Sequence, residues 1–335
     1  MYTCVITIAL LALIGQPGQA SHEKAIQTIE KLGGSVFRKN KQPDGRIVGV
    51  YLEFQKLPKG SLNVLRSFPD LEALMLSGAE FAEEDFEDVA ALQQLENLDL
   101  AGECTTDKVL KVVGKLKKLR WLSAASSKAT DEGIKELGGL PDLEELVLPD
   151  NREVKGVTLG ALKNLRRLRK LELFDSAITD AGLKQVGELV QLHELYLGGT
   201  KITDAGLAHL AKLSELRVLD LGYRRDDFQP FVGEDISDAG LVHLAKLKRL
   251  ESLFLSSPKI TDRGVASLSE LRELKRLWID NAAITDKSLD QLKELKKLER
   301  FGFLGTKISD KGFQALQKHL PKLKAANLPP GWVQP

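Results

Sequence analysis

A motif of 24 residues recurs along most of this chain and fixes what the chain can fold into. The clearest copy runs from Leu192 to Leu207 and reads LHELYLGGTKITDAGL. Steps of 24 residues separate most copies, two steps are 25, and the step from Leu216 to Leu250 is 34. A fixed period of this size is typical of a solenoid, in which each unit packs against its neighbours. The first leucine of each copy corresponds to Ile47, Leu71, Leu95, Leu119, Leu143, Leu168, Leu192, Leu216, Leu250, Leu274, Leu298 and Leu323.

Within one copy, a short strand precedes a helix. Leu192, Leu195 and Leu197 direct apolar side chains into a shared interior at strand-like spacing. Thr203 and Asp204 then begin a helix, because threonine caps free backbone amides and aspartate lies at the positive end of the helix dipole. Each repeat is therefore predicted to contain one strand and one helix. The same start recurs at Thr106, Thr130, Thr179, Ser237, Thr261, Thr285 and Ser309.

The different widths of strands and helices predict a curved array. Strands stack about 4.8 Å apart, whereas helices with their side chains need about 10 Å, so the stack must bend with the strands inside. We predict an α/β solenoid shaped like a horseshoe, with a parallel sheet on the concave face, helices on the convex face and about eleven repeats. The repeats are expected over residues 47–322, between a helical cap at 21–46 and a last strand with a C-terminal cap at 323–335. In the first cap, Ser21 is the expected N-cap of a helix that stops at Gly33.

The repeat itself resembles a known family. The run from Gly199 to Leu207, Gly-Thr-Lys-Ile-Thr-Asp-Ala-Gly-Leu, resembles the leucine-rich repeat family. Within that family the chain is similar to bacterial secreted proteins built on Ile-Thr-Asp-Ala-Gly-Leu repeats, which are kin to the repeat part of F-box proteins. The resemblance covers about Ile47 to Leu328 and implies the same curved fold. The asparagine that many such repeats place after the strand occurs here once, as Asn151.

Residues 1–20 have the layout of a secretory signal peptide. They carry no charge, are apolar from residue 5 to residue 14, and end in Gly-Gln-Ala, with small residues where a signal peptidase reads. The apolar run is shorter than the ~20 residues that span a bilayer. We predict export to the periplasm, cell surface or medium, with no membrane insertion after the signal is removed. A buried strand or helix is the alternative, which the polar residues 21–23 disfavour.

Composition and motifs point away from several functions. The 48 basic and 47 acidic residues leave a net charge of +1, which gives no overall attraction to nucleic acid or to an anionic membrane. Basic pairs such as Lys117-Lys118 are expected at helix C-termini, and the acidic run Glu80–Asp88 is expected as a solvated helix start. No phosphate loop, nucleophile elbow, dinucleotide fingerprint or metal-ligand spacing is present. We predict no nucleic-acid partner, no cofactor, no metal site and no enzymatic activity.

Candidate binding residues lie beside the second leucine of each strand, because side chains alternate across a strand and these point out of the concave face. The residues that follow this leucine are Tyr51, Met75, Asp99, Ser123, Val147, Glu172, Tyr196, Asp220, Phe254, Trp278 and Gly302. Neighbouring outward positions include Trp121, Glu145, Lys170, Phe174, Glu194, Arg276, Asp280 and Arg300. Exposed aromatic residues beside arginine are typical interface anchors. We predict a binding centre at Tyr196, Phe254 and Trp278, joined by Phe174, Arg276 and Arg300; the alternative is that the aromatic residues merely cover the sheet.

Two steps break the regular period. The long step adds about ten residues at 223–235, and insertions in such arrays often map to the binding face. Arg224, Arg225, Phe228 and Phe231 in this insertion are further candidate binding residues, although a neutral surface loop is the alternative. The step after Leu143 replaces Thr-Asp by Lys-Gly at 155–156, which predicts a poorly formed helix.

These features together predict a non-catalytic module that binds a partner protein through its concave sheet. The alternative is a passive spacer of the cell envelope, which would tolerate substitutions on that sheet.

Overall fold

The chain forms one continuous sheet flanked by helices. The computed structural model describes residues 17–41, 45–222 and 235–326, and within these ranges thirteen strands lie side by side in sequence order. Strands from β2 onward pair in parallel, whereas β1 is antiparallel to β2. The strands are β1 (Ser35–Arg38), β2 (Ile47–Tyr51), β3 (Ala73–Met75), β4 (Asn97–Asp99), β5 (Trp121–Ser123), β6 (Glu145–Val147), β7 (Lys170–Glu172), β8 (Glu194–Tyr196), β9 (Val218–Asp220), β10 (Ser252–Ser256), β11 (Arg276–Asp280), β12 (Arg300–Gly302) and β13 (Lys324–Ala325).

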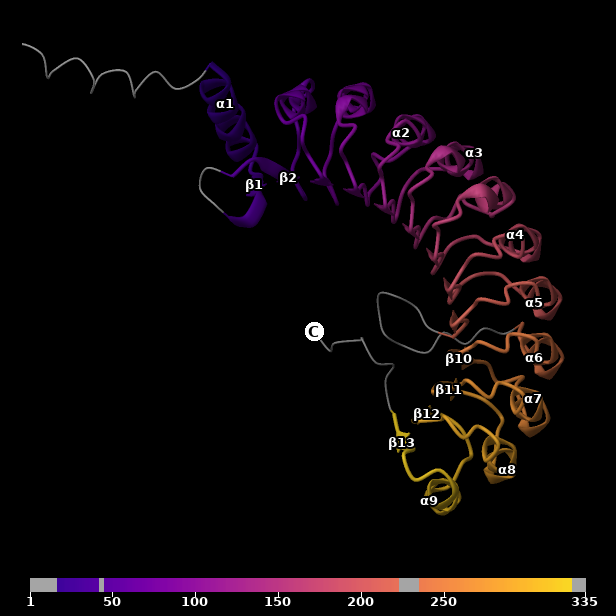
Figure 1. Ribbon diagram of the computed structural model, residues 1–335. Coiled ribbons are helices and arrows are strands. Elements are labelled where there is room, and N and C mark those ends of the chain that lie inside the picture. Colours follow the sequence, from indigo (N-terminus) through magenta and orange to yellow (C-terminus); the bar gives the residue numbers. More distant parts are fainter. Residues whose placement is uncertain (1–16, 42–44, 223–234, 327–335) are drawn as a thin grey trace, which may run out of the picture.

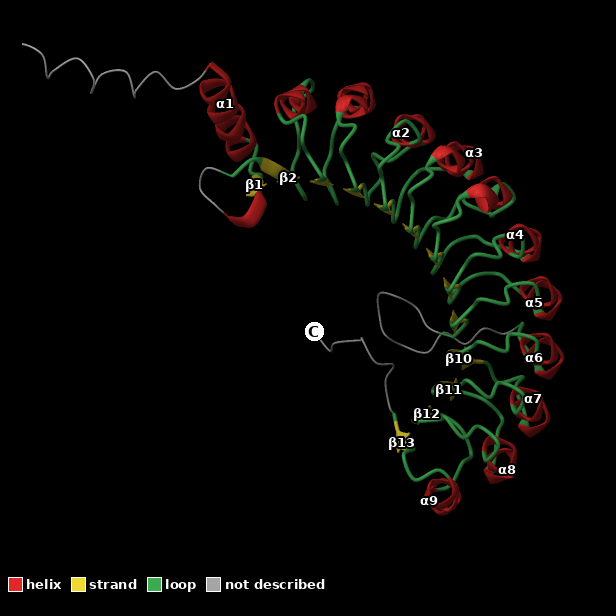
Figure 2. Ribbon diagram, in the orientation of Figure 1, coloured by secondary structure: helices red, strands yellow, loops and turns green. Residues whose placement is uncertain are grey.

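The sheet lines the inner side of an open arc, and the helices form its outer side (Figures 1 and 2). In successive strands the central leucines are paired in register, for example Leu98 with Leu122 and Leu171 with Leu195. These leucines are fully buried in one core that runs the length of the array. The predicted α/β leucine-rich repeat solenoid with a parallel sheet is therefore confirmed.

The helical elements are of two kinds, α-helices and 3₁₀ helices, and most α-helices on the outer side follow a Thr-Asp or Ser-Asp start. The α-helices are α1 (Pro17–Lys31), α2 (Asp107–Val113), α3 (Asp131–Glu136), α4 (Asp180–Val186), α5 (Asp204–Leu210), α6 (Asp238–Leu244), α7 (Asp262–Leu268), α8 (Leu289–Leu292) and α9 (Asp310–His319). The 3₁₀ helices are η1 (Lys39–Lys41), η2 (Ser61–Ser67), η3 (Glu83–Ala91), η4 (Leu137–Gly139), η5 (Leu159–Asn164) and η6 (Asp286–Ser288). Repeats without Thr-Asp form η2, η3 and η5, so the weak helix predicted after residues 155–156 is confirmed.

Each Thr-Asp start also joins its repeat to the next. The carboxylate of Asp180 accepts the N–H of Thr203 at 2.8 Å and the Thr203 hydroxyl at 2.7 Å. The same hydroxyl accepts the N–H of Ala205, as a helix N-cap does. We call this pair of hydrogen bonds the inter-repeat bridge. It recurs from Asp107 to Thr130, Asp204 to Ser237, Asp238 to Thr261, Asp262 to Thr285 and Asp286 to Ser309.

The bridge explains the glycine that follows the aspartate by two residues in most of these repeats. A Cβ atom on Gly206 would lie 2.2 Å from Oδ1 of Asp180, the aspartate of the preceding repeat. Equivalent distances are 2.3 Å from Gly240 to Asp204 and 2.2 Å from Gly264 to Asp238. The carboxylate of the preceding repeat therefore favours glycine here, although Ser288 takes the same position beside the bridge from Asp262 to Thr285.

The N-terminal end differs from the prediction. Helix α1 begins at Pro17, so Ser21 lies inside the helix and is not its N-cap. The helix stops where predicted, because Gly33 takes a left-handed φ of +83° and the N–H of Gly34 closes onto the carbonyl of Ile29. Strand β1 then pairs with β2 in the antiparallel sense, which the sequence analysis did not anticipate. The predicted signal peptide falls largely on residues 1–16, outside the described residues.

Two polar residues that interrupt the apolar pattern are buried. Asp85, expected in a solvated helix start, is buried and accepts the N–H of Gly60 in the preceding repeat at 2.6 Å. That expectation was wrong because this carboxylate joins repeats rather than facing water. Asn151 is also fully buried, where its side chain accepts the N–H of Ser127 at 2.9 Å and donates to the carbonyl of Ala124 at 2.9 Å. Asn151, the one asparagine at the repeat position after the strand, therefore stabilises the turn between repeats.

Candidate partner-binding surface

Two rows of side chains cross the concave face from strand to strand. The first row precedes the central leucine and consists of Gly49, Ala73, Asn97, Trp121, Glu145, Lys170, Glu194, Val218, Ser252, Arg276, Arg300 and Lys324. The second row follows it and consists of Tyr51, Met75, Asp99, Ser123, Val147, Glu172, Tyr196, Asp220, Phe254, Trp278 and Gly302. The register predicted for these positions is confirmed, and the two rows define the candidate binding surface.

The predicted binding centre is not uniformly exposed. Trp278 has no exposed surface and Phe254 only 6%, and their rings stack with centroids 4.9 Å apart. Gly302 follows Trp278 in the second row, and its missing side chain lets the indole lie flat over the next strand, where a Cβ would meet Cδ1 at 2.0 Å. Ala326 packs against the same pair. The expectation that Phe254 and Trp278 are exposed anchors was wrong, because alternation sets the direction of a side chain but not what covers it.

Several other predicted positions on this face are also buried. Phe174 is buried with its ring 5.4 Å from that of Tyr196, and Asp280 is buried with its carboxylate accepting the N–H of Leu304 at 2.7 Å. Asp220 is buried as well and accepts the N–H of Gly222 at 3.0 Å. These residues hold the strand ends together rather than offering free groups.

The middle of the sheet carries a charged cluster around a half-buried tyrosine. The hydroxyl of Tyr196 donates to Glu194 at 2.8 Å, and Nζ of Lys170 lies 5.6 Å from the centre of the Tyr196 ring. Lys170 pairs with Glu172 at 2.7 Å and approaches Glu145 at 3.8 Å. Lys170 therefore contacts acidic groups on its own strand and on the preceding strand, and it also contacts the aromatic ring.

This cluster shifts the pKa of both titratable partners. Burial, followed by the negative charge of Glu194, raises the pKa of Tyr196 far above its ordinary value, so the phenol stays protonated and keeps its hydrogen bond. Burial has the largest single effect and would lower the pKa of Lys170, but the hydrogen bond and charge of Glu172, together with the charges of Glu145 and Glu194, outweigh it and the net pKa is raised. Tyr196 is thus held in one orientation at neutral pH while the residue remains partly accessible.

The N-terminal end of the surface exposes aromatic groups that sequence analysis did not single out. Phe37 on β1 is 43% exposed, and a Cβ on Gly49 would meet both Phe37 and the Tyr51 ring. Phe54 is 77% exposed and has φ of +58°. Gly, Ser, Asp or Asn occupies this left-handed position in other repeats, because a bulky L-residue is strained there. Comparing the turn position across repeats could have identified Phe54.

A shallow groove runs along the strand-end rim beside this region. Its volume is about 580 Å³, and Leu57, Phe81 and Cys104 contribute to its lining. Two ion pairs border it, Lys56 with Glu80 at 3.4 Å and Lys128 with Glu103 at 2.9 Å.

The C-terminal end of the surface is basic. Arg276, Arg300 and Lys324 occupy the first row on three consecutive strands, and Arg300 and Lys324 are exposed. Sequence analysis identified the two arginines but not Lys324, although the repeat places it in the same row. Arg224, Arg225, Phe228 and Phe231, the candidates in the insertion, lie outside the described residues.

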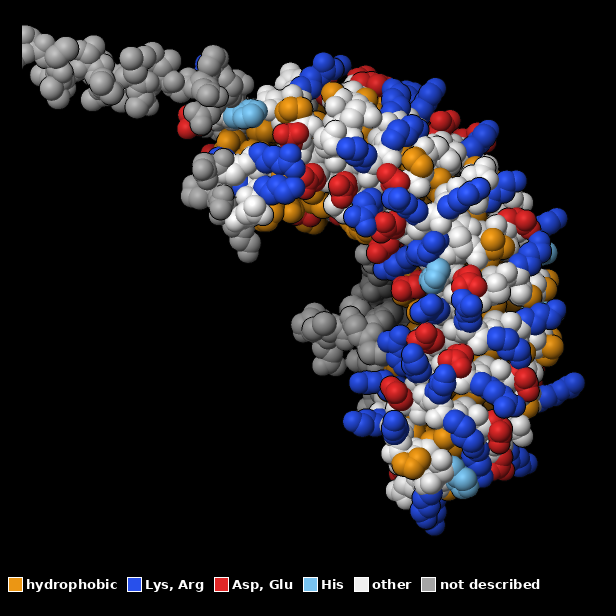
Figure 3. Space-filling view, viewed as in Figure 1, with side chains coloured by type: hydrophobic (Ala, Val, Ile, Leu, Met, Phe, Trp, Pro, Cys, Tyr) orange, Lys and Arg blue, Asp and Glu red, His pale blue; other side chains and the backbone are white. Residues whose placement is uncertain are grey.

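Charges on the helix side are mostly paired between repeats. Figure 3 shows Lys and Arg interspersed with Asp and Glu over the visible side of the solenoid. Lys297 contacts Glu273 at 2.6 Å and Lys212 contacts Glu188 at 2.5 Å, each reaching the preceding repeat. Lys117 donates to the carbonyl of Gly114, the C-cap of α2, as expected for a cation at a helix C-terminus. Among the described helices, none is both long and apolar enough to cross a membrane.

Comparisons with known proteins support the fold. A solved internalin structure from Listeria monocytogenes aligns over 92% of this chain and 95% of its own, with a TM-score of 0.60 and 19% sequence identity. Internalin C2 from the same organism aligns over 68% of this chain and 84% of its own, with a TM-score of 0.46 and 22% identity. No protein-family model and no curated protein match the sequence. At this level of identity, the first of these likenesses establishes a shared fold.

Proposed function

We propose that this leucine-rich repeat solenoid is a non-catalytic module that binds a partner protein across its concave sheet. A solenoid presents an extended concave surface whose side chains the repeat does not dictate, which suits recognition of a large partner. Export, as predicted from residues 1–20, would place this partner outside the cytoplasm.

The observation that carries the proposal is the accessible but fixed Tyr196. The side chain is held by Glu194, by the adjacent Phe174 ring and by Lys170. A group that is already ordered loses little conformational freedom on binding, so its contact area contributes more to affinity. Tyrosine is also among the residues enriched at interface hot spots. We therefore place the centre of the proposed contact at Tyr196.

The other candidates divide by accessibility. Arg276 and Arg300 stay in the proposed contact because their side chains reach solvent. Phe254, Trp278 and Phe174 are buried, so we assign them to shaping the surface beneath a partner. Accessible Tyr51 and Trp121 extend the proposed contact toward the N-terminal end.

Affinity capture with matched variants tests the proposal. The wild-type chain, Tyr196→Ala and the helix-side control Lys212→Ala are used as baits against envelope and culture-fluid fractions of the source organism. We expect a saturable protein partner that wild type and Lys212→Ala retain and Tyr196→Ala loses, with all three proteins folded by circular dichroism. Identical capture by all three baits, or no saturable partner, would favour the passive spacer instead.

A further inference from the structure

The basic end of the concave sheet carries three cations that form no ion pair within the described residues. Arg276, Arg300 and Lys324 are aligned by the pairing of β11, β12 and β13, so their side chains lie on one face at the spacing between strands, about 4.8 Å. We call these three residues the cationic ladder. Like charges directly opposite each other on neighbouring strands repel. An anionic partner would relieve this repulsion.

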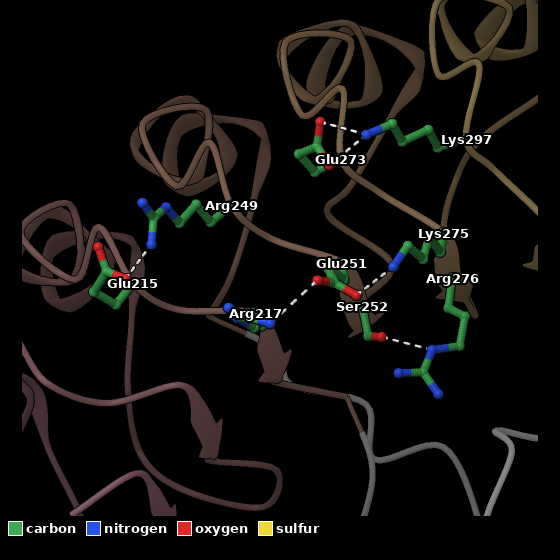
Figure 4. A network of polar contacts seen from close by, with 9 residues as sticks. All are labelled: Glu215, Arg217, Arg249, Glu251, Ser252, Glu273, Lys275, Arg276 and Lys297. Atoms are coloured by element: carbon green, nitrogen blue, oxygen red, sulfur yellow. Dashed lines mark hydrogen bonds and ion pairs between the residues drawn. The ribbon is translucent and has the colours of Figure 1, made fainter. Parts of the chain in front are cut away.

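The carboxylate of Glu251, which directly precedes β10, is already engaged. Glu251 accepts from Lys275 at 2.7 Å and lies 3.8 Å from Arg217 (Figure 4). Lys275 and the adjacent Arg217 and Arg276 all act to lower the pKa of Glu251. Figure 4 also shows Nε of Arg276 donating to the Ser252 hydroxyl at 2.7 Å, while the rest of its guanidinium points away from the paired charges.

Within the part of the chain that the structure describes, no carboxylate forms an ion pair with a member of the cationic ladder. The middle of the sheet shows the alternative, since Lys170 there lies between Glu145 and Glu172. Hydrogen-bond donors are also in excess near the ladder. The indole N–H of Trp278 lies over Gly302, on the strand that carries Arg300, and has no acceptor among the described residues.

We propose that the cationic ladder binds an acidic helix of the partner protein, laid along the solenoid axis. This inference rests on the proposed function and names the chemistry of the partner. Side chains three and four residues apart on a helix are about 5–6 Å apart, close to the spacing of the ladder. Same-face side chains of an extended segment are separated by about 6.8 Å and match it less well. Arginine favours carboxylates because its planar donors can bind both oxygens.

Nucleic acid fits the same surface less well. Binding that depends on phosphate contacts usually draws on about six to ten cations, whereas the ladder contains three. The observations therefore favour a short acidic stripe on a protein.

Peptide binding to the full chain tests the inference. The probes are a fluorescent alanine-based helical peptide of about 20 residues with glutamates at i, i+4 and i+7, a scrambled peptide of the same composition, and a single-stranded oligonucleotide. Variants are Arg300→Glu and Lys324→Glu in the ladder, with Arg272→Glu as a matched, exposed helix-side control. Binding is measured by anisotropy at low and at physiological salt, and folding by thermal melting.

We expect the striped peptide to bind wild type and Arg272→Glu alike, about tenfold more weakly to either ladder variant, and less tightly as salt rises. The ladder variants should melt no lower than wild type, because a glutamate would pair with the flanking cations. Equal binding of the scrambled peptide, tighter binding of the oligonucleotide, or no loss in the ladder variants would overturn the inference. A captured partner that depends on Tyr196 but not on Arg300 would do the same while leaving the proposed function intact.

Discussion

The helix side and the concave sheet of the same repeats treat polar side chains in opposite ways. On the helix side, both carboxylate oxygens of Asp180 accept hydrogen bonds from the next repeat, and most of the equivalent aspartates do the same. On the sheet, Arg300 and Lys324 have no ion-pair partner in the described part of the chain, and they stand in register where they repel. The repeated aspartates thus hold the array together, whereas Arg300 and Lys324 form no ion pair among the described residues.

The largest expected effect comes from placing a methyl group in the bridge. Helix propensity alone predicts that Gly206→Ala stabilises α5 by about 1 kcal/mol. The 2.2 Å approach of the new Cβ to Asp180 predicts the opposite, a loss of about 2 kcal/mol from overpacking. Denaturant unfolding of the single variant decides the sign. In the Asp180→Ala background, Gly206→Ala should become neutral or stabilising. If the effects of the two substitutions on unfolding free energy were additive in the double-mutant cycle, the steric contact between residue 206 and Asp180 would be contradicted.

A smaller effect concerns pH. Hydrogen bonds from the hydroxyl and N–H of Ser309 lower the pKa of Asp286 below its ordinary value of 3.8. A carboxylate with a lowered folded-state pKa contributes its full stability above the unfolded pKa and loses it as pH falls through the folded pKa. We therefore expect the wild-type melting temperature to fall more steeply below about pH 4 than that of Asp286→Asn. Parallel melting curves between about pH 5 and 2.5 would show that this bridge does not titrate with folding.

The smallest effect should have the opposite sign. Phe54→Gly removes a strained left-handed backbone and almost no buried surface, so we expect a gain of up to about 1 kcal/mol in unfolding free energy. Phe37→Ala, at an exposed position without positive φ, is the matched control and should be close to neutral. A clear loss on Phe54→Gly would mean that the ring stabilises the fold through its contact with Gly78. A gain in unfolding free energy would mean that the exposed Phe54 ring does not stabilise the fold, which leaves binding as its expected role.

Much of the architecture follows from the period. The spacing of leucines predicts the strands, and alternation across them predicts that Tyr196, Phe254 and Trp278 share a row, as they do. Burial of Trp278 could not be predicted from alternation, because it depends on the small Gly302 one strand away and on Ala326.

Contacts between repeats could not be predicted from the sequence of one repeat either. Asp204 and its equivalents were interpreted as helix-dipole residues, whereas their bonds cross to the following repeat. The glycine that follows most of these aspartates by two residues has the same origin, because it contacts the aspartate of the preceding repeat. The left-handed backbone of Phe54 could have been predicted only by comparing the residues at the turn after each strand, and not from the strands themselves. The proposed contact at Tyr196 remains a prediction that binding measurements must test.

The reversal of β1 bears on how copies of this protein can meet. A parallel solenoid sheet could in principle continue from the last strand of one molecule into the first strand of another and grow into a filament. Strand β1 runs against the direction of β2 and of every later strand. A second copy whose strands keep the direction of β2 would meet β1 in the antiparallel sense, so an uninterrupted parallel sheet cannot continue across this end. One reversed strand of four residues therefore ends the parallel pairing of the array on its N-terminal side.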